Sequence, residues 1–387
     1  MNSLFAVILF IGMGSGIISP MIGPLIFSDH GFFSDADIEF RMQAYSLIMG
    51  VYAFGQILGN PTWGVISDKI GGKRSIIWAL AGSLGGYALC LMGLFYAVFP
   101  LFFIGRWIDG AMAGRRTIAL AMISRESKEK TTSFKRAEIM NAAGLLLGPI
   151  ASGALIGSAN GSTLRDYSAP IVFMLLIISL NIILILRGKY KEIVSVNEGK
   201  KNSLFSGKSL NVYSVFFLFQ CGWYLYFLTI TPYIIIHWAF TPFLVGVFFS
   251  GLILFYILIL AFLLPKLRKK IPDNLMNIGA LFIGAISMAL IGLGGGNFYL
   301  FLIFNAGVAI ATALSTPVFM TKISNLKGQA GQGAAIGLQN SIIGFAWLIA
   351  AIFNGLIASG NLQVSFILGG AVFLISACFM TLNNKII

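Results

Sequence analysis

Charged residues are scarce in this sequence, and so are the side chains on which most enzymes and metal sites depend. Only 10% of the 387 residues are Asp, Glu, Lys or Arg, whereas a soluble domain of this length carries about 25%. There are 2 histidines, and the 3 cysteines (Cys90, Cys221 and Cys378) are too scattered for a metal or redox motif. No spacing of Ser, Asp or Cys suggests a catalytic group. We therefore predict a protein that is neither soluble nor an enzyme, with no metal and no cofactor.

Apolar residues make up 58% of the chain, and they occur in long runs. A helix that spans a bilayer needs about 20 mainly apolar residues. Glycine and proline inside such runs do not argue against spans, because both are commoner in transmembrane helices than in soluble ones. The predicted fold is an all-α membrane protein with twelve transmembrane helices, over residues 4–27, 43–66, 75–96, 99–123, 137–158, 168–187, 210–235, 241–264, 273–293, 297–321, 329–357 and 361–382.

The 26 basic residues outnumber the 13 acidic ones and give a net charge of +13. Most of these bases fall in every second connection between the predicted spans, whereas the opposite face has only Arg41 and Arg165. This asymmetry is typical of the positive-inside rule and predicts that both termini are cytoplasmic. The first span lacks the basic start and cleavage site of a signal peptide, so we expect it to be a retained helix. We expect a monomer in a bacterial inner membrane, with the lipid bilayer and a small-molecule substrate as partners and no nucleic acid.

A polar, basic connection divides the spans into two sets of six. It covers residues 188–209, is rich in Gly and Ser, and is typical of a linker. The sequence thus predicts an N-terminal bundle over residues 1–187 and a C-terminal bundle over residues 210–387. Membrane transporters are often built from such repeats, with the substrate site near the bilayer midplane between them. A channel or a non-transporting sensor of the same architecture remains an alternative.

The segment between the second and third spans, "GNPTWGVISDKIGGKR" (residues 59–74), combines glycines, one acid and three bases. In spacing and position it resembles the signature loop of the major facilitator superfamily. The matching residues are Gly59, Gly64, Asp68, Lys69, Gly71, Lys73 and Arg74. The resemblance implies a conformational latch that holds the two halves together on the cytoplasmic side. Asp68 would then accept hydrogen bonds from the start of the eleventh span, residues 328–333. A simple positive-inside cluster with an incidental Asp is the alternative.

Two further motifs resemble that family. In the fourth span, Arg106-x2-Asp109-Gly110 is similar to its intramembrane arginine motif. In the fifth span, the motif that marks the drug/proton antiporter branch is matched, with Ser152 in place of a glycine, by Gly144, Gly148, Pro149 and Gly153. The resemblance therefore implies a twelve-helix secondary transporter that exports a small molecule in exchange for protons, with the proton gradient as its energy source. Proton-coupled uptake is the alternative direction.

The fourth span holds four charged residues, although each charge near the bilayer centre costs at least about 2.5–3.5 kcal/mol. At 100° per residue, Arg106, Asp109 and Arg116 share one face and Arg115 points elsewhere. We predict an ion pair between Arg106 and Asp109. Burial favours the protonated form of Asp109 and a neighbouring Arg favours the ionised form. Asp109 and Arg106 are therefore the candidates for proton coupling, and a purely structural counter-ion is the alternative role for Asp109.

Three arginines against one aspartate in the membrane make the predicted cavity net positive. Arginine binds carboxylate and phosphate in a bidentate manner, so an anionic cargo such as a carboxylate metabolite or siderophore is as credible as a drug. The first, fourth, seventh and tenth spans line the cavity in the resembled family. The predicted substrate-binding residues are Arg106, Arg116, Gln220, Tyr224 and Asn305. For the last three, hydrogen bonding between helices is the alternative.

Overall fold

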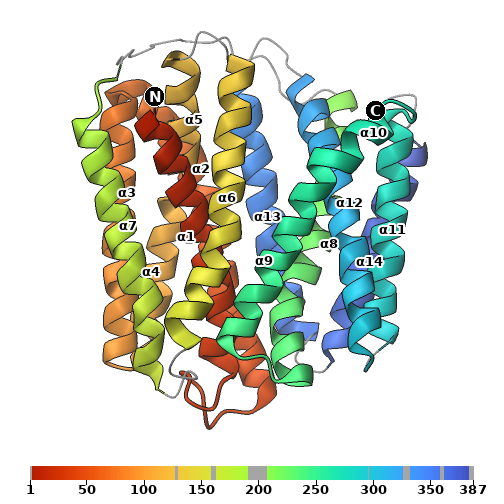
Figure 1. Ribbon diagram of the computed structural model, residues 1–387, viewed down its shortest axis with the longest axis horizontal. Helices are drawn as coiled ribbons and strands as arrows, with labels where there is room; N and C mark the ends of the chain where they lie inside the picture. The colour runs from red at the N-terminus through yellow and green to blue at the C-terminus, as the bar shows by residue number, and fades with distance from the viewer. Residues whose placement is uncertain are drawn as a thin grey trace. The chain divides into compact units, whose positions relative to one another are not determined.

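The computed structural model describes residues 2–126, 130–157, 163–190, 207–294, 296–325, 332–357 and 361–382. Within these residues the chain is helical and contains no strand. Figure 1 shows the helices in order along the chain. They are α1 (Asn2–Phe27), α2 (Ile38–Ile70), α3 (Gly72–Phe95), α4 (Phe99–Ala111), α5 (Arg115–Glu126), α6 (Lys130–Gly157), the 3₁₀-helix η1 (Leu164–Tyr167), α7 (Ser168–Arg187), α8 (Gly207–Trp238), α9 (Pro242–Leu258), the π-helix η2 (Ile259–Leu263), α10 (Leu264–Arg268), α11 (Asp273–Leu293), α12 (Phe298–Asn325), α13 (Gln332–Ile357) and α14 (Leu362–Leu382).

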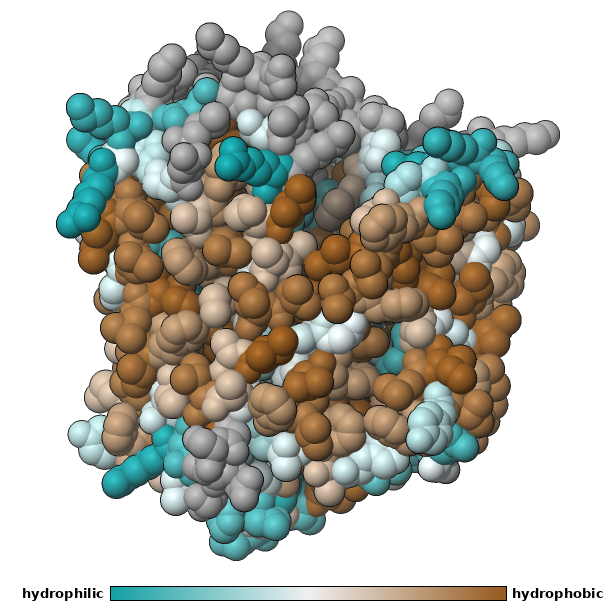
Figure 2. All heavy atoms as spheres, in the orientation of Figure 1, coloured by the Kyte–Doolittle hydropathy of each residue, from teal (hydrophilic) through white to brown (hydrophobic). Residues whose placement is uncertain are grey.

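As far as the structure describes them, the predicted spans each coincide with a helix or with consecutive helices. Within the described residues, ten helical segments are long and apolar enough to cross a membrane. The two remaining predicted spans fall short for different reasons: α2 carries Gln43, Gln56 and Asn60, and the fourth span is divided into α4 and α5. The all-α membrane fold is confirmed, and the count of twelve membrane-crossing helices is confirmed for ten. Figure 2 shows apolar side chains along the helix flanks and hydrophilic ones near the helix ends, as membrane embedding requires.

The chain forms two compact units. The first contains residues 1–37, 48–198 and 234–250, and the second contains residues 38–47, 199–233 and 251–387. In the first unit α1 packs against α6, and α3 against α4 and α7. In the second unit α11 packs against α12 and α14 (Figure 1). Most of the predicted linker, residues 191–206, lies outside the described residues, so the boundary at 188–209 stays a prediction.

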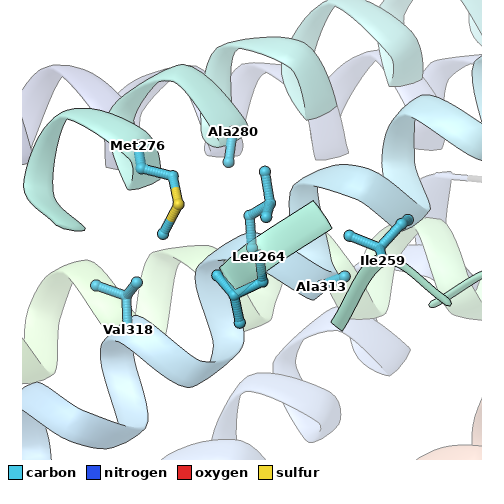
Figure 3. Close-up of a cluster of buried hydrophobic side chains, with 7 residues drawn as sticks. Ile259, Leu264, Met276, Ala280, Ala313 and Val318 are labelled. Carbon is cyan, nitrogen blue, oxygen red and sulfur yellow. The ribbon is translucent and has the colours of Figure 1, made fainter. Parts of the chain in front are cut away.

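A π-helical turn between α9 and α10 belongs to the core of the second unit. Pro265 has no N–H to donate to the carbonyl four residues earlier, and the wider π turn over Ile259–Leu263 accommodates this loss. Figure 3 shows the cluster of buried side chains around that turn. It combines α11 and α12 with the turn, through Ile259, Leu264, Met276, Ala280, Ala313, Leu314 and Val318.

Candidate functional site

The predicted fourth span is not one continuous helix. α4 ends at Ala111, a turn follows, and α5 begins at Arg115. The carbonyl oxygen of Ala111 accepts a hydrogen bond from the indole N–H of Trp63 in α2, at 2.9 Å. That indole replaces the amide that a continuous helix would supply. A Cβ added at Gly114 would lie 2.5 Å from the Cβ of Trp63, so the turn after Ala111 lies directly against α2.

The break between α4 and α5 determines which arginines pair with Asp109. The Arg106 Nη1 donates to Asp109 Oδ2 at 3.0 Å, which confirms the predicted ion pair. The second partner is Arg115, whose Nη1 donates to Asp109 Oδ1 at 3.0 Å and also to the hydroxyl of Ser83 in α3. The side chain of Asp109 is only 2% exposed. Asp109 therefore lies in a buried network in which each carboxylate oxygen accepts a hydrogen bond from a different arginine.

The prediction that Arg116 shares the face of Asp109 is wrong, because the rotation of 100° per residue does not continue through the turn at residues 112–114. Arg116 Nη2 instead donates to both carboxylate oxygens of Glu138 in α6, at 2.8 and 3.1 Å. This pair is partly exposed, with 38% of the Arg116 side chain and 58% of the Glu138 side chain accessible. Arg116 is thus already paired with an acid outside the buried network, and its role in substrate binding stays a prediction.

Arg106 makes one further contact, with the ring of Tyr52 in α2. The guanidinium carbon lies 4.4 Å from the ring centroid, within the range of a cation–π interaction. Gln56 in turn donates to the Tyr52 hydroxyl at 3.2 Å. Arg106 Nε is buried and has no hydrogen-bond partner among the described residues. A buried donor without a partner costs about 1–3 kcal/mol, so Arg106 has an N–H that a ligand would stabilise.

The predicted signature loop is almost entirely helical. α2 continues through Lys69 to Ile70 and α3 starts at Gly72, so only Gly71 separates them. Gly71 has φ 89° and ψ 153°, a conformation that is accessible essentially only to glycine. A Cβ added at Gly59 would lie 2.0 Å from the carbonyl oxygen of Ala111, whereas one added at Gly64 would meet nothing within 4 Å. Of these two glycines, only Gly59 permits a close approach of helices.

The bases of this segment differ in their surroundings. Lys73 Nζ donates to the carbonyl oxygens of Leu186 and Gly188 at 3.0 and 2.9 Å, and so caps the C-terminal end of α7. It also lies 5.8 Å from the ring centroid of Tyr190. Burial raises the pKa of Tyr190, against the hydrogen bond of its hydroxyl with Ser3. Lys73 therefore has partners within the first unit.

Lys69 and Arg74 are exposed. The side chain of Asp68 and its predicted partners at residues 328–333 lie outside the described side chains. The latch between the two halves stays a prediction.

The antiporter-like motif of α6 forms two close helix contacts. A Cβ added at Gly144 would lie 2.1 Å from the carbonyl oxygen of Leu9, and one at Gly148 would lie 2.5 Å from that of Met13, both in α1. Pro149 and Gly153 instead contact α9. A Cβ at Gly246 would lie 2.2 Å from the Pro149 carbonyl oxygen, and one at Gly153 would lie 2.8 Å from the Cα of Phe243. The motif thus lets α6 lie against α1 and α9 with backbone touching backbone.

The predicted residues of the second unit have different surroundings. Asn305 is fully buried, accepts a hydrogen bond from the Tyr226 hydroxyl and donates to the carbonyl oxygen of Phe301 at 2.6 Å. It therefore bonds helix to helix, which was the alternative for this residue. Gln220 is 7% exposed. The ring of Tyr224 stacks on that of Trp347 in α13, with centroids 4.9 Å apart and an interplanar angle of 13°.

Sequence reasoning missed three residues of these sites, namely Tyr52, Ser83 and Trp347. Each is a polar or aromatic residue in an apolar span, and the sequence has many such residues, so their type alone did not single them out.

A comparison with known families agrees with this arrangement of helices. The sequence model of the Major Facilitator Superfamily matches residues 4–303. The chain belongs to the major facilitator superfamily. Members of that superfamily are membrane transporters, so the family assigns this protein to the membrane-embedded transporters and not to the enzymes.

Among relatives in this superfamily, the chain is 29% identical to the class H tetracycline resistance protein of Pasteurella multocida over 192 residues, which is 48% of this chain and 44% of that protein. It is 29% identical to the class D tetracycline resistance protein of Salmonella ordonez over 147 residues, which is 38% of this chain and 35% of that protein. These matches cover less than half the length of either relative.

Two solved structures share the superfamily fold over nearly the whole chain. One is the human organic anion transporter MFSD10, with a TM-score of 0.73, 16% identity and 98% coverage of both chains. The other is a D-xylose–proton symporter, with a TM-score of 0.77, 13% identity, and coverage of 98% of this chain and 97% of that one. At these identities the likeness concerns the fold alone.

Proposed function

We propose that this transporter exports a small organic molecule in exchange for protons, with Asp109 as the group that carries the proton. The observation behind the proposal is the buried carboxylate of Asp109, whose two oxygens each accept a hydrogen bond from an arginine. A proton on Asp109 removes the negative charge that both guanidiniums require in a low-dielectric site. Protonation of Asp109 is therefore incompatible with the intact arginine network. We expect it to be accompanied by a rearrangement around the break between α4 and α5.

The proposed direction of transport is export, and it rests on a sequence motif and on the relatives. The motif around Gly148 and Pro149 resembles that of the drug/proton antiporter branch, and the relatives at 29% identity are named for resistance to tetracycline. Resistance through a transporter requires that the drug leaves the cell, so export is the direction that these relatives favour. We place the protein in the bacterial inner membrane with both termini in the cytoplasm, because its basic residues concentrate in every second connection.

Uptake of an anionic metabolite or siderophore with protons is the second candidate, and the charge of the network favours it. Two arginines and one aspartate give the buried network a formal charge of +1, and Arg106 Nε has no hydrogen-bond partner among the described residues. An anion that binds Arg106 competes with ionised Asp109 for the same guanidinium. A proton on Asp109 would then promote anion binding, and cotransport would result. A cargo without negative charge does not compete with Asp109 for the Arg106 guanidinium. For such a cargo, exchange against protons is the coupling that we expect.

Proteoliposomes with an imposed pH gradient test both the coupling and its direction. Exchange predicts that tetracycline or 2-naphthoate accumulates in vesicles with an acidic interior, whereas cotransport predicts accumulation when the exterior is acidic. Asp109→Asn should reduce gradient-driven accumulation to background while exchange of labelled for unlabelled cargo persists, since that exchange needs no net proton movement. The persisting exchange also shows that the variant is folded.

Glu138→Gln is the matched control, because it removes an acid that is 58% exposed and lies outside the buried network. It should retain gradient-driven accumulation. Undiminished accumulation by the Asp109→Asn protein would refute the role given to Asp109.

A further inference from the structure

Three aromatic side chains of α8 and α13 contact one another and form what we call the aromatic cluster: Tyr224, Phe227 and Trp347. Tyr224 and Trp347 lie nearly parallel, with centroids 4.9 Å apart. Phe227 meets both rings edge to face, at 6.4 Å from Tyr224 and 6.5 Å from Trp347, with interplanar angles of 87° and 86°. Offset stacking and edge-to-face contact are the geometries that aromatic pairs prefer.

On α8, the two rings of the aromatic cluster do not lie on an exposed stripe. Between residues 211 and 235 no side chain of α8 is exposed, and each is either buried or half-buried. A lipid-facing helix of the same unit is different: α11 exposes Leu275, Ile286 and Leu293 by 61%, 58% and 72%. The half-buried rings of Tyr224 and Phe227 therefore belong to a stretch of α8 that has no exposed stripe.

On α13, Trp347 lies on the side opposite the lipid-facing stripe. Among the described side chains of α13, those half or more exposed are Phe345, Ile352, Phe353 and Leu356, and three of them, Phe345, Ile352 and Leu356, recur at intervals of seven and four residues. Trp347 follows Phe345 by two positions, which is about 200° around the helix. Its indole is therefore not an interfacial anchor of the kind that places tryptophan at a membrane surface.

Partial burial distinguishes the aromatic cluster from the packing core. Phe216, Phe219 and Phe319 also contact one another, and each is at most 1% exposed. By contrast, Tyr224, Phe227 and Trp347 are all half-buried. A core cluster is fully covered, and a lipid-facing one is exposed along a stripe. The aromatic cluster is neither, so part of its ring surface stays accessible although the rings belong to no exposed stripe.

We infer that the aromatic cluster is a binding site for a planar aromatic or conjugated ring of the transported molecule. This inference rests on the proposed transport function and names the class of its cargo. Polar side chains occur on the same helix faces: Gln220 lies one turn before Tyr224, and Asn340 lies two turns before Trp347. They would contact polar substituents on the ring. Because a flat ring stacks on Trp347 better than a puckered one, the cargo is selected by its planarity as well as by its charge.

The test compares three probes that separate planarity from charge: 2-naphthoate, its saturated analogue decalin-2-carboxylate, and the neutral 2-naphthalenemethanol. Affinities are measured on the purified full-length protein. Wild type should bind 2-naphthoate more tightly than decalin-2-carboxylate by about two- to tenfold, the range that one aromatic contact contributes. Trp347→Leu should bring that ratio close to one, whereas Trp347→Phe should keep most of it. Because the readout is a ratio within one variant, a change in the amount of folded protein does not alter it.

Trp78→Leu is the matched control, since Trp78 in α3 is 65% exposed and lies in the other unit. Its ratio should equal that of wild type. Equal affinity of wild type for the two acids, an unchanged ratio in Trp347→Leu, or no binding of any probe would overturn the inference. If only the neutral alcohol binds, and Trp347→Leu weakens it, the aromatic cluster stands and the anionic cargo is excluded. Proton coupling is measured in a separate experiment, the proteoliposome assay of the Asp109→Asn variant.

Discussion

We expect alanine substitutions at two glycines of α2, Gly59 and Gly64, to have opposite effects on stability, although both glycines belong to the segment that resembles the family signature. Substitution of Gly59 by Ala places a Cβ 2.0 Å from the carbonyl oxygen of Ala111 and 2.6 Å from its carbon. Ordinary contact begins at 3.4 Å, so the backbone of α2 or α4 must move by about 1.4 Å, the difference between 3.4 and 2.0 Å. Overpacking of this kind costs about 1–3 kcal/mol, and a clash of backbone with backbone belongs at the upper end.

Helix propensity acts in the other direction. Alanine is about 1 kcal/mol more favourable than glycine inside a helix. Gly59→Ala should therefore lower the free energy of unfolding by roughly 2 kcal/mol, whereas Gly64→Ala, which meets nothing within 4 Å, should raise it by up to about 1 kcal/mol. The two substitutions lie in the same helix, so the propensity contribution cancels between them. The difference, about 3 kcal/mol, isolates the contact with Ala111.

The assay is thermal unfolding of the two purified variants side by side, followed by gradient-driven transport in proteoliposomes. Gly59→Ala should also reduce transport, because the carbonyl it displaces accepts the Trp63 hydrogen bond and lies just before the turn that positions Arg115. Equal melting temperatures for Gly59→Ala and Gly64→Ala would refute the reasoning, and so would a Gly64→Ala protein that is less stable than wild type.

Three further substitutions test the local geometry. Arg115→Met should cost about 1.5–3 kcal/mol, the range for a hydrogen bond to a charged group, while Arg116→Met should cost only about 0–1 kcal/mol because its pair with Glu138 is partly exposed. Equal losses of melting temperature would contradict the assignment of Arg115 to the buried network. Gly71→Ala should destabilise by about 1–3 kcal/mol, since φ 89° with ψ 153° is strained for any residue with a Cβ; an unchanged melting temperature would show that the connection between α2 and α3 relaxes at little cost.

Much of the fold could be predicted from composition and periodicity, because a bilayer allows few alternatives to a long apolar helix. The predicted spans 75–96, 168–187 and 273–293 agree with α3, α7 and α11 to within three residues at each end. The predicted connection between the second and third spans, residues 67–74, was too long. Polar residues after position 66 indicated the end of a span, but a helix can continue beyond the bilayer, and α2 does so as far as Ile70.

The site was less predictable, for one physical reason. Rotation of 100° per residue assumes an unbroken helix, and the turn between Ala111 and Arg115 depends on a contact with Trp63, 48 positions earlier in the chain. The pair Arg106–Asp109 lies before the turn and was predicted correctly. The partner beyond the turn was assigned to Arg116, whereas Arg115 occupies that place. No local pattern gives the position of an indole on another helix.

The buried network also bears on how the chain enters the membrane during synthesis. Its members Ser83, Arg106, Asp109 and Arg115 come from the consecutive helices α3, α4 and α5. Each unpaired charge would oppose insertion by at least about 2.5–3.5 kcal/mol. Because Asp109 is synthesised between its two arginines, the pairing needs no residue from the second half. The most costly part of the sequence to place in lipid thus carries its own counter-charge, and it is ready to insert before helices α6 to α14 have left the ribosome.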